Sequence, residues 1–286
     1  MRPRADSPNS VEPEVNSALT SGRKKAKRPS SSKVFRGDLE SEALVSLAHA
    51  ALNDLAGGKS NRRQIAPTVS DHCLNAFCSL LLAGKTRPAL NFTLMYSRRG
   101  ADYRTIAEDL FAAAARRLGD RYACDKLSAP EVNIGSATLT RTHVAFCSML
   151  ERPRPTLEAC AVFGSFVDQA HTLGLSFAAE YFRRNGWNVH YMPGTNPDAF
   201  FAAVKAEKPD IVGLTAAFDR DIEILQDVIG RLRTLKPGPR IIVGGNAPNR
   251  ARLNPDAVVS RLDMGLLAGH RLLGYPPHTG ASLVKF

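Results

Sequence analysis

The spacing of the apolar residues changes once along this 286-residue chain, and that change most constrains its fold. Before residue 150 the apolar side chains recur every three or four positions, which is typical of helices. After Pro153 and Pro155, which interrupt any helix, short apolar runs alternate with helical patterns. This alternation predicts an α/β domain with a doubly wound parallel sheet of the flavodoxin-like, Rossmann-like type.

The half before the two prolines predicts an all-α domain of four or five helices. The expected helices cover residues 38–57, 68–82, 88–96, 103–118 and 128–149. We expect Ser70 to cap the second of these helices and Gly119 to end the fourth. The chain therefore divides into an arm at residues 1–36, a helical domain at 37–150 and a sheet domain at 151–286.

The arm carries much of the positive charge. The chain has 38 Lys+Arg and 27 Asp+Glu, a net charge of +11, and residues 1–36 contribute nine basic and three acidic residues. Because this segment is rich in Ser and Pro and poor in large apolar residues, we expect it to be disordered. Its basic run at residues 23–28 can contact DNA phosphates, and a solubilising tail without a partner is an equal alternative. No helix-turn-helix, zinc-finger or RNA-binding signature follows it.

Composition and cysteine spacing exclude several classes of protein. No apolar run approaches the roughly 18 residues of a spanning helix, so no membrane anchor is expected. The first residues lack the apolar stretch of a secretory signal, so we expect a cytoplasmic protein. The five cysteines lack a C-x-x-C spacing, which argues against disulfides and zinc and favours free thiols. A redox role for Cys73 and Cys78 is the alternative.

In the second half, the loops that follow the strands are the places to look for a ligand. The expected strands cover residues 157–166, 187–192, 211–216 and 240–243, and the expected helices cover 173–185, 197–208 and 220–235. Ligands of such sheets bind beyond the carboxyl ends of the strands. The loops at 164–174, 215–220 and 244–249 contain neither a dinucleotide fingerprint nor a P-loop, so ordinary nucleotide binding loses its best support.

Each of these loops carries one suggestive feature. The first has His171 with Gly174 three residues later, the second has the hydroxyl of Thr215, and the third has the Gly244-Gly245 pair. Adjacent glycines allow a ligand to approach the backbone closely, but a tight turn would also explain them. A lone histidine is more often structural than a ligand, so no single loop identifies a function.

Together, the three features resemble the cobalamin-binding domain, whose pattern is D-x-H-x-x-G, then S-x-L, then G-G. Here 40 residues separate Gly174 from Thr215, and 26 separate Ala217 from Gly244. The helical half contains further segments similar to the cap domain that covers the corrin in that family. These segments are Arg98-Arg99-Gly100-x-x-Tyr103, residues 114–122, residues 125–128 and Val132-x-Ile134-Gly135. The resemblance covers about residues 38–265.

The resemblance implies cobalamin as the cofactor and a role for each motif residue. His171 would be the lower axial ligand of cobalt, because neutral imidazole is a good nitrogen donor to transition metals. Gly174, Gly244 and Gly245 would leave room for the displaced nucleotide tail, and the hydroxyl of Thr215 would contact its base. Haem is the alternative cofactor, since a related domain holds haem.

The chain departs from the family pattern at several positions. The aspartate that orients the ligand histidine is replaced by Gln169, while Asp168 lies one residue early and could still reach the ring. The serine of S-x-L is Thr215, and the tryptophan of the cap is Tyr122. Residues 132–133 replace the Glu-His pair of light-sensing relatives, so no upper histidine ligand is expected.

Among families with this plan, the chain looks most like the AerR/PpaA antirepressors of photosynthesis genes. That resemblance implies a light- or redox-responsive regulator, not an enzyme, which acts on a CrtJ/PpsR-type repressor while its arm helps on DNA. A corrinoid carrier protein of a methyltransferase system is the alternative, and a scaffold without cofactor is a third possibility. Residues 266–286 are expected to be a tail over the sheet edge, with His270 and His278 exposed.

Overall fold

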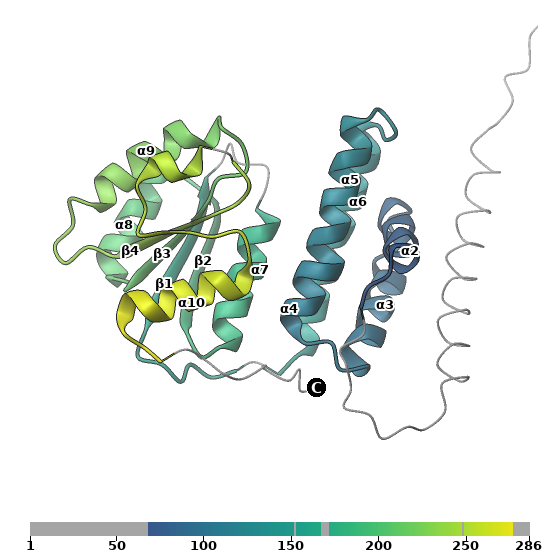
Figure 1. Cartoon of the computed structure of the whole chain (residues 1–286), viewed down its shortest axis with the longest axis horizontal. Helices are drawn as coiled ribbons and strands as arrows, with labels where there is room; N and C mark the ends of the chain where they lie inside the picture. The colour runs from purple at the N-terminus through teal and green to yellow at the C-terminus, as the bar shows by residue number, and fades with distance from the viewer. Residues whose placement is uncertain (1–67, 152, 167–171, 248, 277–286) are drawn as a thin grey trace, which may run out of the picture.

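The computed structural model describes residues 68–151, 153–166, 172–247 and 249–276. A helical bundle lies beside a parallel sheet that is covered by helices on both faces (Figure 1). The predicted fold class is therefore confirmed. The arm at 1–36 and the expected helix at 38–57 lie outside the described residues. None of the helices in the described ranges is long and apolar enough to span a membrane.

The bundle is built from segments close to those expected. Its elements are α2 (Asp71–Leu82), α3 (Thr86–Arg98), α4 (Tyr103–Thr105), η1 (Ile106–Ala112), α5 (Ala113–Ala123) and α6 (Ala129–Met149). Ser70 caps α2, because its side chain accepts a hydrogen bond from the amide of Cys73 at 3.3 Å. At the start of α6, Ser128 and Glu131 form a capping box.

One expected helix end is wrong. The helix continues past Gly119 to Ala123, and the backbone leaves the helical conformation at Asp125, where φ is +55°. Glycine inside a helix costs only about 1 kcal/mol relative to alanine, so it does not by itself end one. The run from Tyr103 is continuous, with the π-helical segment η1 in its middle.

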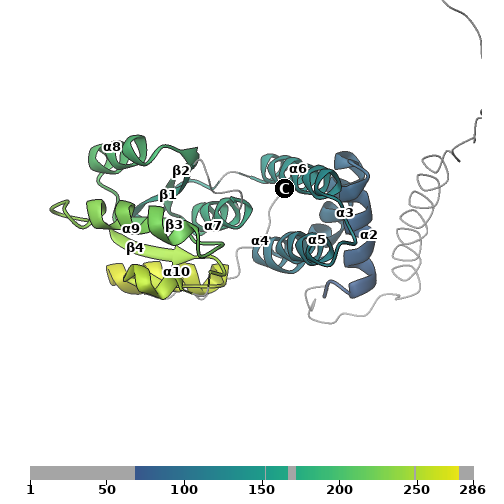
Figure 2. The same ribbon diagram turned by 90° about the horizontal axis from the view of Figure 1, so that it is seen from above.

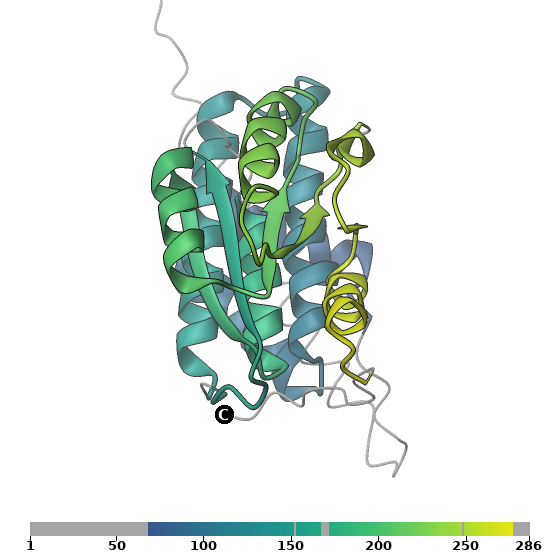
Figure 3. The ribbon, with the colours of Figure 1, turned by 90° about the vertical axis from the view of Figure 1, so that its left-hand side faces the viewer.

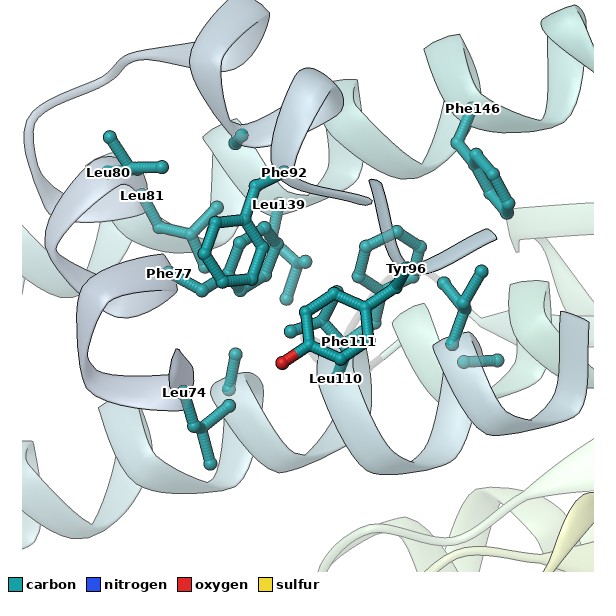
Figure 4. Packing of buried hydrophobic residues seen from close by; sticks show 14 of the residues in the cluster. Leu74, Phe77, Leu80, Leu81, Phe92, Tyr96, Leu110, Phe111, Leu139 and Phe146 are labelled. Atoms are coloured by element: carbon teal, nitrogen blue, oxygen red, sulfur yellow. The ribbon is translucent and has the colours of Figure 1, made fainter. Parts of the chain in front are cut away.

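Aromatic side chains fill the core of the bundle (Figure 4). The ring of Phe77 lies 5.5 Å from that of Phe92 and 6.0 Å from that of Phe111, measured between centroids. Phe111 also lies 5.9 Å from Phe177, which belongs to the sheet domain. The apolar core of the bundle therefore continues into the neighbouring domain.

The sheet has five strands, all parallel, in the order β2-β1-β3-β4-β5. The strands are β1 (Cys160–Phe166), β2 (Asn188–Thr195), β3 (Ile211–Thr215), β4 (Arg240–Gly244) and β5 (Ala257–Val258). This is the flavodoxin-like order, and it places the ligand edge where the chain order reverses at β1 and β3. The fifth strand was not expected, because two residues are too short for a recognisable apolar pattern.

Four helices cover the sheet, two on each face (Figure 2). They are α7 (Leu173–Arg184), α8 (Pro197–Glu207), α9 (Asp221–Leu232) and α10 (Leu262–Leu273), and the short 3-10 helix η2 (Arg250–Leu253) precedes β5. α8 and α9 pack on one face, while α7 and α10 pack on the other. The bundle lies against the outer side of α7 (Figure 2).

The expectation of a tail at residues 266–286 is wrong for its described part. This segment continues α10, and the side chain of His270 is buried, with 2% exposed. His270 Nε2 accepts a hydrogen bond from Trp187 Nε1 at 3.2 Å, and its Nδ1 lies 3.0 Å from the carbonyl oxygen of Pro276. His270 is therefore a satisfied core histidine, while His278 lies outside the described residues.

Candidate functional site at the carboxyl ends of the strands

The strands all run in one direction, and their carboxyl ends meet at the top of the view in Figure 3. The end of α5 and the beginning of α6 lie at the same end of the molecule, beside the sheet (Figure 1). The loops of the sheet domain and the end of the bundle that carries Tyr122 thus share one side of the protein. The candidate site lies there.

The structure brings Thr215 and Gly244 together. They are register partners at the ends of β3 and β4, so both face the side of the sheet covered by α7 and α10. Thr215 is buried, with 7% of its surface exposed. A Cβ placed on Gly244 would lie 3.8 Å from the carbonyl oxygen of Leu214 and 4.0 Å from that of Val259, which is ordinary van der Waals contact, so a small side chain would fit there.

The second glycine of the pair has a different role. Gly245 has φ +95°, and a Cβ there would lie 2.1 Å from the carbonyl oxygen of Ala216. That carbonyl also accepts a hydrogen bond from the amide of Ala247 at 3.0 Å. The turn therefore explains Gly245, whereas none of the described residues would clash with a Cβ on Gly244.

The first loop is described only in part. His171, Asp168 and Gln169 lie outside the described residues. Gly174 is the second residue of α7; it is exposed, and no atom of the described residues would lie within 4 Å of a Cβ placed on it.

Tyr122 lies in the last turn of α5, and half of its surface is exposed. Val132 is half-buried and Asn133 is exposed in the first turns of α6. The end of α5 and the beginning of α6, which carry these residues, lie at the same end of the molecule as the carboxyl ends of β3 and β4 (Figure 1).

Sequence reasoning missed Asp221, which shapes the loop after β3. This side chain is 5% exposed, and its Oδ2 accepts hydrogen bonds from the amides of Ala217 at 2.8 Å and Phe218 at 3.0 Å. The carboxylate thereby fixes the turn that follows Thr215. An acidic residue in the first turn of an expected helix was the available signal.

It also missed a polar cluster between the bundle and α7. The hydroxyl of Tyr103 lies 2.9 Å from His143 Nε2 and donates to the carbonyl of Phe177 at 3.4 Å. Cys147 Sγ lies 3.2 Å from the same histidine nitrogen. Tyr103 belongs to one of the cap-like segments, but it sits at the contact with α7. The i, i+4 spacing of His143 and Cys147 was the available signal.

Burial dominates the titration of this cluster. Burial, helped by the positive charge of Arg184, lowers the pKa of His143 to about 4, so the ring is neutral near pH 7. Burial raises the pKa of Cys147 to about 12, with the Glu180 carboxylate adding to the effect. It also raises the pKa of Tyr103 well above its ordinary value. The cluster is therefore uncharged, as a buried contact requires.

A second polar contact joins the bundle to the beginning of α10. Glu108, in the π-helical segment η1, accepts a hydrogen bond from the amide of Leu262 at 2.7 Å. Its carboxylate also lies 3.7 Å from the guanidinium of Arg261, and Arg104 lies 3.8 Å from Asp263. The carboxylate caps the amino end of α10, where the helix dipole favours negative charge.

The described residues contain no group of three His, Cys, Asp or Glu side chains that could hold a metal ion. Burial raises the pKa of Cys78 to about 11, which keeps this thiol protonated and poorly reactive. A redox role for the Cys73 and Cys78 pair gains no support from that environment.

The comparisons with known proteins agree with this geometry. Residues 159–260 match the family model described as the B12 binding domain. The sheet carries a B12-binding domain. No curated protein matches the chain. The monomethylamine corrinoid protein of Methanosarcina barkeri has a similar structure, with a TM-score of 0.58 and 11% identity over 66% of this chain and 93% of that one.

Two further structures are similar at lower scores. A cobalamin-binding protein from Desulfitobacterium hafniense DCB-2 is 16% identical over 70% of this chain and 98% of its own, with a TM-score of 0.38. The methanol:cobalamin methyltransferase complex MtaBC of Methanosarcina barkeri is 16% identical over 78% of this chain and 89% of that one, with a TM-score of 0.39. The similarity in fold therefore rests on the monomethylamine corrinoid protein, with its TM-score of 0.58.

The residues at the site fit a corrinoid. Neither Gly174 nor Gly244 carries a side chain that would keep a bulky group from the backbone, and Thr215 supplies a hydroxyl at the same level as Gly244. The domain match identifies the cofactor as cobalamin.

Proposed function

We propose that the chain is a cobalamin-dependent regulator of the AerR/PpaA type, without an enzymatic activity of its own. In this proposal cobalamin is held at the carboxyl edge of the sheet, next to the end of the bundle. Occupancy or photochemistry there changes how the bundle and the sheet domain pack, and with it the surface that a partner meets.

The observation that carries this proposal is the buried contact between the two domains. Phe177 of α7 completes the core of the bundle, and the Tyr103–His143 pair and Glu108 add polar contacts on either side of it. A contact of this kind couples the conformations of the two domains, because neither domain can move without changing this contact. A sensor needs such coupling between its ligand site and its surface.

The residues that would hold the cofactor come from three loops of the sheet domain and from the last turn of α5. His171 would bind cobalt from below, with Asp168 or Gln169 near its ring. Gly174 and Gly244, which lack side chains, would leave room for the nucleotide tail, Gly245 would form the turn beside it, and Thr215 would contact its base. When bound, cobalamin supplies light absorption and a cobalt whose upper ligand can be exchanged. Tyr122 would border the upper face.

The proposed partner is a CrtJ/PpsR-type repressor. The sequence carries no recognisable helix-turn-helix signature, so regulation would act through that partner, while the basic run at residues 23–28 adds salt-dependent contacts to DNA. Pull-down of the repressor by the cobalamin-loaded chain, and loss of repressor from its operator, would support this role. Equal capture by the loaded and the cofactor-free chain would contradict it.

The first test is cofactor binding by the whole chain. We expect hydroxocobalamin to stay with the protein through gel filtration, with an altered absorption spectrum. His171→Ala should remove the spectral change, whereas His190→Ala, at an exposed histidine on β2 paired with Glu207, should keep it. A chain that retains no corrinoid would contradict the proposal. The remaining possibility would then be a scaffold that binds no cofactor.

A corrinoid carrier of a methyltransferase system is the second candidate. The fold favours this candidate, because the structural similarity extends over 93% of the monomethylamine corrinoid protein. A carrier must expose cobalt to two enzymes in turn, so it predicts methylcobalamin formation on the chain by a cognate methyltransferase. Methyl transfer at catalytic rates would overturn the regulator in favour of the carrier.

A further inference from the structure

A buried histidine fastens the segment after α10 to the sheet domain. His270 lies in the last turn of α10, between Trp187, which precedes β2, and Pro276, which follows the helix. Its Nε2 is 3.2 Å from Trp187 Nε1, and its Nδ1 is 3.0 Å from the carbonyl oxygen of Pro276. The imidazole therefore joins this segment to the amino end of β2, at the opposite end of the strands from the candidate site.

These two partners fix the protonation state of the ring. The indole Nε1 of Trp187 can only donate, so His270 Nε2 must accept and carries no proton. The carbonyl of Pro276 can only accept, so Nδ1 must carry the proton. Both hydrogen bonds therefore require the neutral ring, because a proton added to Nε2 would face the N–H group of the indole.

The packing around the ring is close. Tyr275 stands edge-on to both rings, with its centroid 6.1 Å from that of His270 and 6.3 Å from that of Trp187. A Cβ placed on Gly269 of α10 would lie 3.2 Å from Phe182 and 3.3 Å from Trp187, so α10 cannot move closer to the sheet. Only 2% of His270 is exposed. A charged ring in this place would lack water, and it would have to move outward to regain it.

The charged groups on the surrounding elements are engaged elsewhere. At the end of α7, Arg183 donates to a backbone carbonyl of β2, and Arg184 pairs with Glu180 at 2.9 Å. Arg271, the next residue of α10, is exposed. Tyr275 is the titratable side chain whose ring contacts the imidazole, and a phenol stays neutral where an imidazole titrates. The imidazole is thus the group of this contact whose charge changes between about pH 5 and pH 8.

We propose that His270 is an acid-sensitive clamp, which holds the segment after α10 against Trp187 when the ring is neutral and releases it when the ring is protonated. The bond to Pro276 survives protonation, because Nδ1 keeps its proton, whereas the bond from Trp187 is lost. The ring and the segment should therefore move together, away from the indole. The clamp is separate from the candidate site, so the inference does not rest on the proposed function.

The experiment uses the indole as its reporter, because Trp187 is the one tryptophan of the chain. Fluorescence emission and the indole N–H resonance of the ¹⁵N-labelled whole chain are followed between about pH 8 and pH 5. On acidification the emission should shift to longer wavelength. The protection of the indole N–H against exchange with water should fall at least about 10-fold, since its hydrogen bond is lost. Both changes should follow the binding of one proton and reverse on return to alkaline pH.

Two variants assign the response to one histidine. The amide of His270→Gln offers an acceptor and a donor but does not titrate, so the protection of the indole should stay constant. His143→Gln is the matched control: it removes the other buried histidine of the described residues and should respond as the native chain does. If His270→Gln does not fold, the ¹⁵N resonances of the ring in the native chain still test the clamp. The proton should lie on Nδ1 alone at alkaline pH and on both nitrogens in acid.

Several outcomes would overturn the clamp. They are an indole signal of the native chain that does not depend on pH, a proton on Nε2 at alkaline pH, and a response that His270→Gln retains. A response that His143→Gln abolishes as well would belong to the contact between the two domains. Loss of the far-UV circular dichroism together with the indole response would mean that the whole chain unfolds. Cobalamin is absent from these measurements, so a failure of the proposed function leaves the test unaffected.

Discussion

The two faces of the sheet use the same packing device but differ at the carboxyl edge. On the α8/α9 face, Gly164 lies under the ring of Phe200, which in turn meets Phe166 edge-on at 5.5 Å. Phe166 ends β1 and is fully buried, so this face is closed up to its edge. On the α7/α10 face, a ring covers Gly213, but no described side chain lies within 4 Å of a Cβ placed on Gly244 at the next level.

This difference indicates which face serves stability and which serves binding. A glycine that lies under an aromatic ring is explained by packing, whereas Gly244 has no side chain packed against it among the described residues. The α7/α10 face is also the one against which the bundle packs, through α7 and the beginning of α10. Substitutions on the two faces should therefore separate into those that change folding and those that change binding.

The largest expected effect is on the closed face. In Gly164→Ala the new Cβ would lie 2.1 Å from a ring carbon of the buried Phe200, so we expect a loss of about 3 kcal/mol in the free energy of unfolding. Urea titration followed by circular dichroism measures it. Loss of cobalamin binding without any loss of stability would mean that this face also serves the ligand.

On the α7/α10 face, Gly244→Val should act on binding. The branched side chain would occupy the space beside β4, so cobalamin affinity should fall at least about 100-fold, while the free energy of unfolding changes by less than about 1 kcal/mol. Titration calorimetry and urea unfolding of the same sample measure the two quantities. A variant that binds cobalamin normally would place the nucleotide tail elsewhere.

The buried contact between the bundle and α7 should make the stability of the chain fall in acid. The pKa of His143 is lowered from 6.5 to about 4 in the folded chain. Between these two pH values, therefore, His143 is protonated in the unfolded chain but neutral in the folded chain. Stability should fall by about 2 kcal/mol between pH 7 and pH 5. Urea unfolding at the two pH values measures this, and His143→Gln should remove most of the difference. If this variant shows the same pH dependence of stability as the native chain, other titratable groups cause that dependence.

The smallest expected effect concerns Thr215. Thr215→Val keeps the shape of the side chain but removes the hydroxyl that would contact the base, so cobalamin should bind about 5-fold more weakly. Thr215→Ser should bind as the native chain does. Cobinamide, without a base, should bind all three chains equally. Weakened cobinamide binding in Thr215→Val would show that the substitution disturbs the loop instead.

The sequence predicted most of the fold, because apolar spacing is a local signal. It identified the described helices of the bundle and four of the five strands. It missed α10, whose pattern is interrupted by Gly265, Gly269 and the buried His270. Those residues pack against Trp187 and Phe182, and such long-range contacts leave no trace in local spacing.

The site was predicted as a set of loops, but not in its detail. Thr215 and Gly244 were expected to be neighbours, because parallel strands end at one edge. That a side chain would clash at Gly245 but not at Gly244 depends on where the carbonyl of Ala216 lies, which a sequence does not specify. The Tyr103–His143 pair joins residues 40 positions apart and belongs to no motif.

The most direct test of the central claim is electron paramagnetic resonance of the chain loaded with Co(II) cobalamin and labelled with ¹⁵N at histidine. If His171 binds cobalt from below, and the base of the cofactor lies beside Gly244, the superhyperfine pattern of the axial nitrogen should change from three lines to two on labelling. A three-line pattern unchanged by the label would mean that the base of the cofactor still binds cobalt, and would contradict the account.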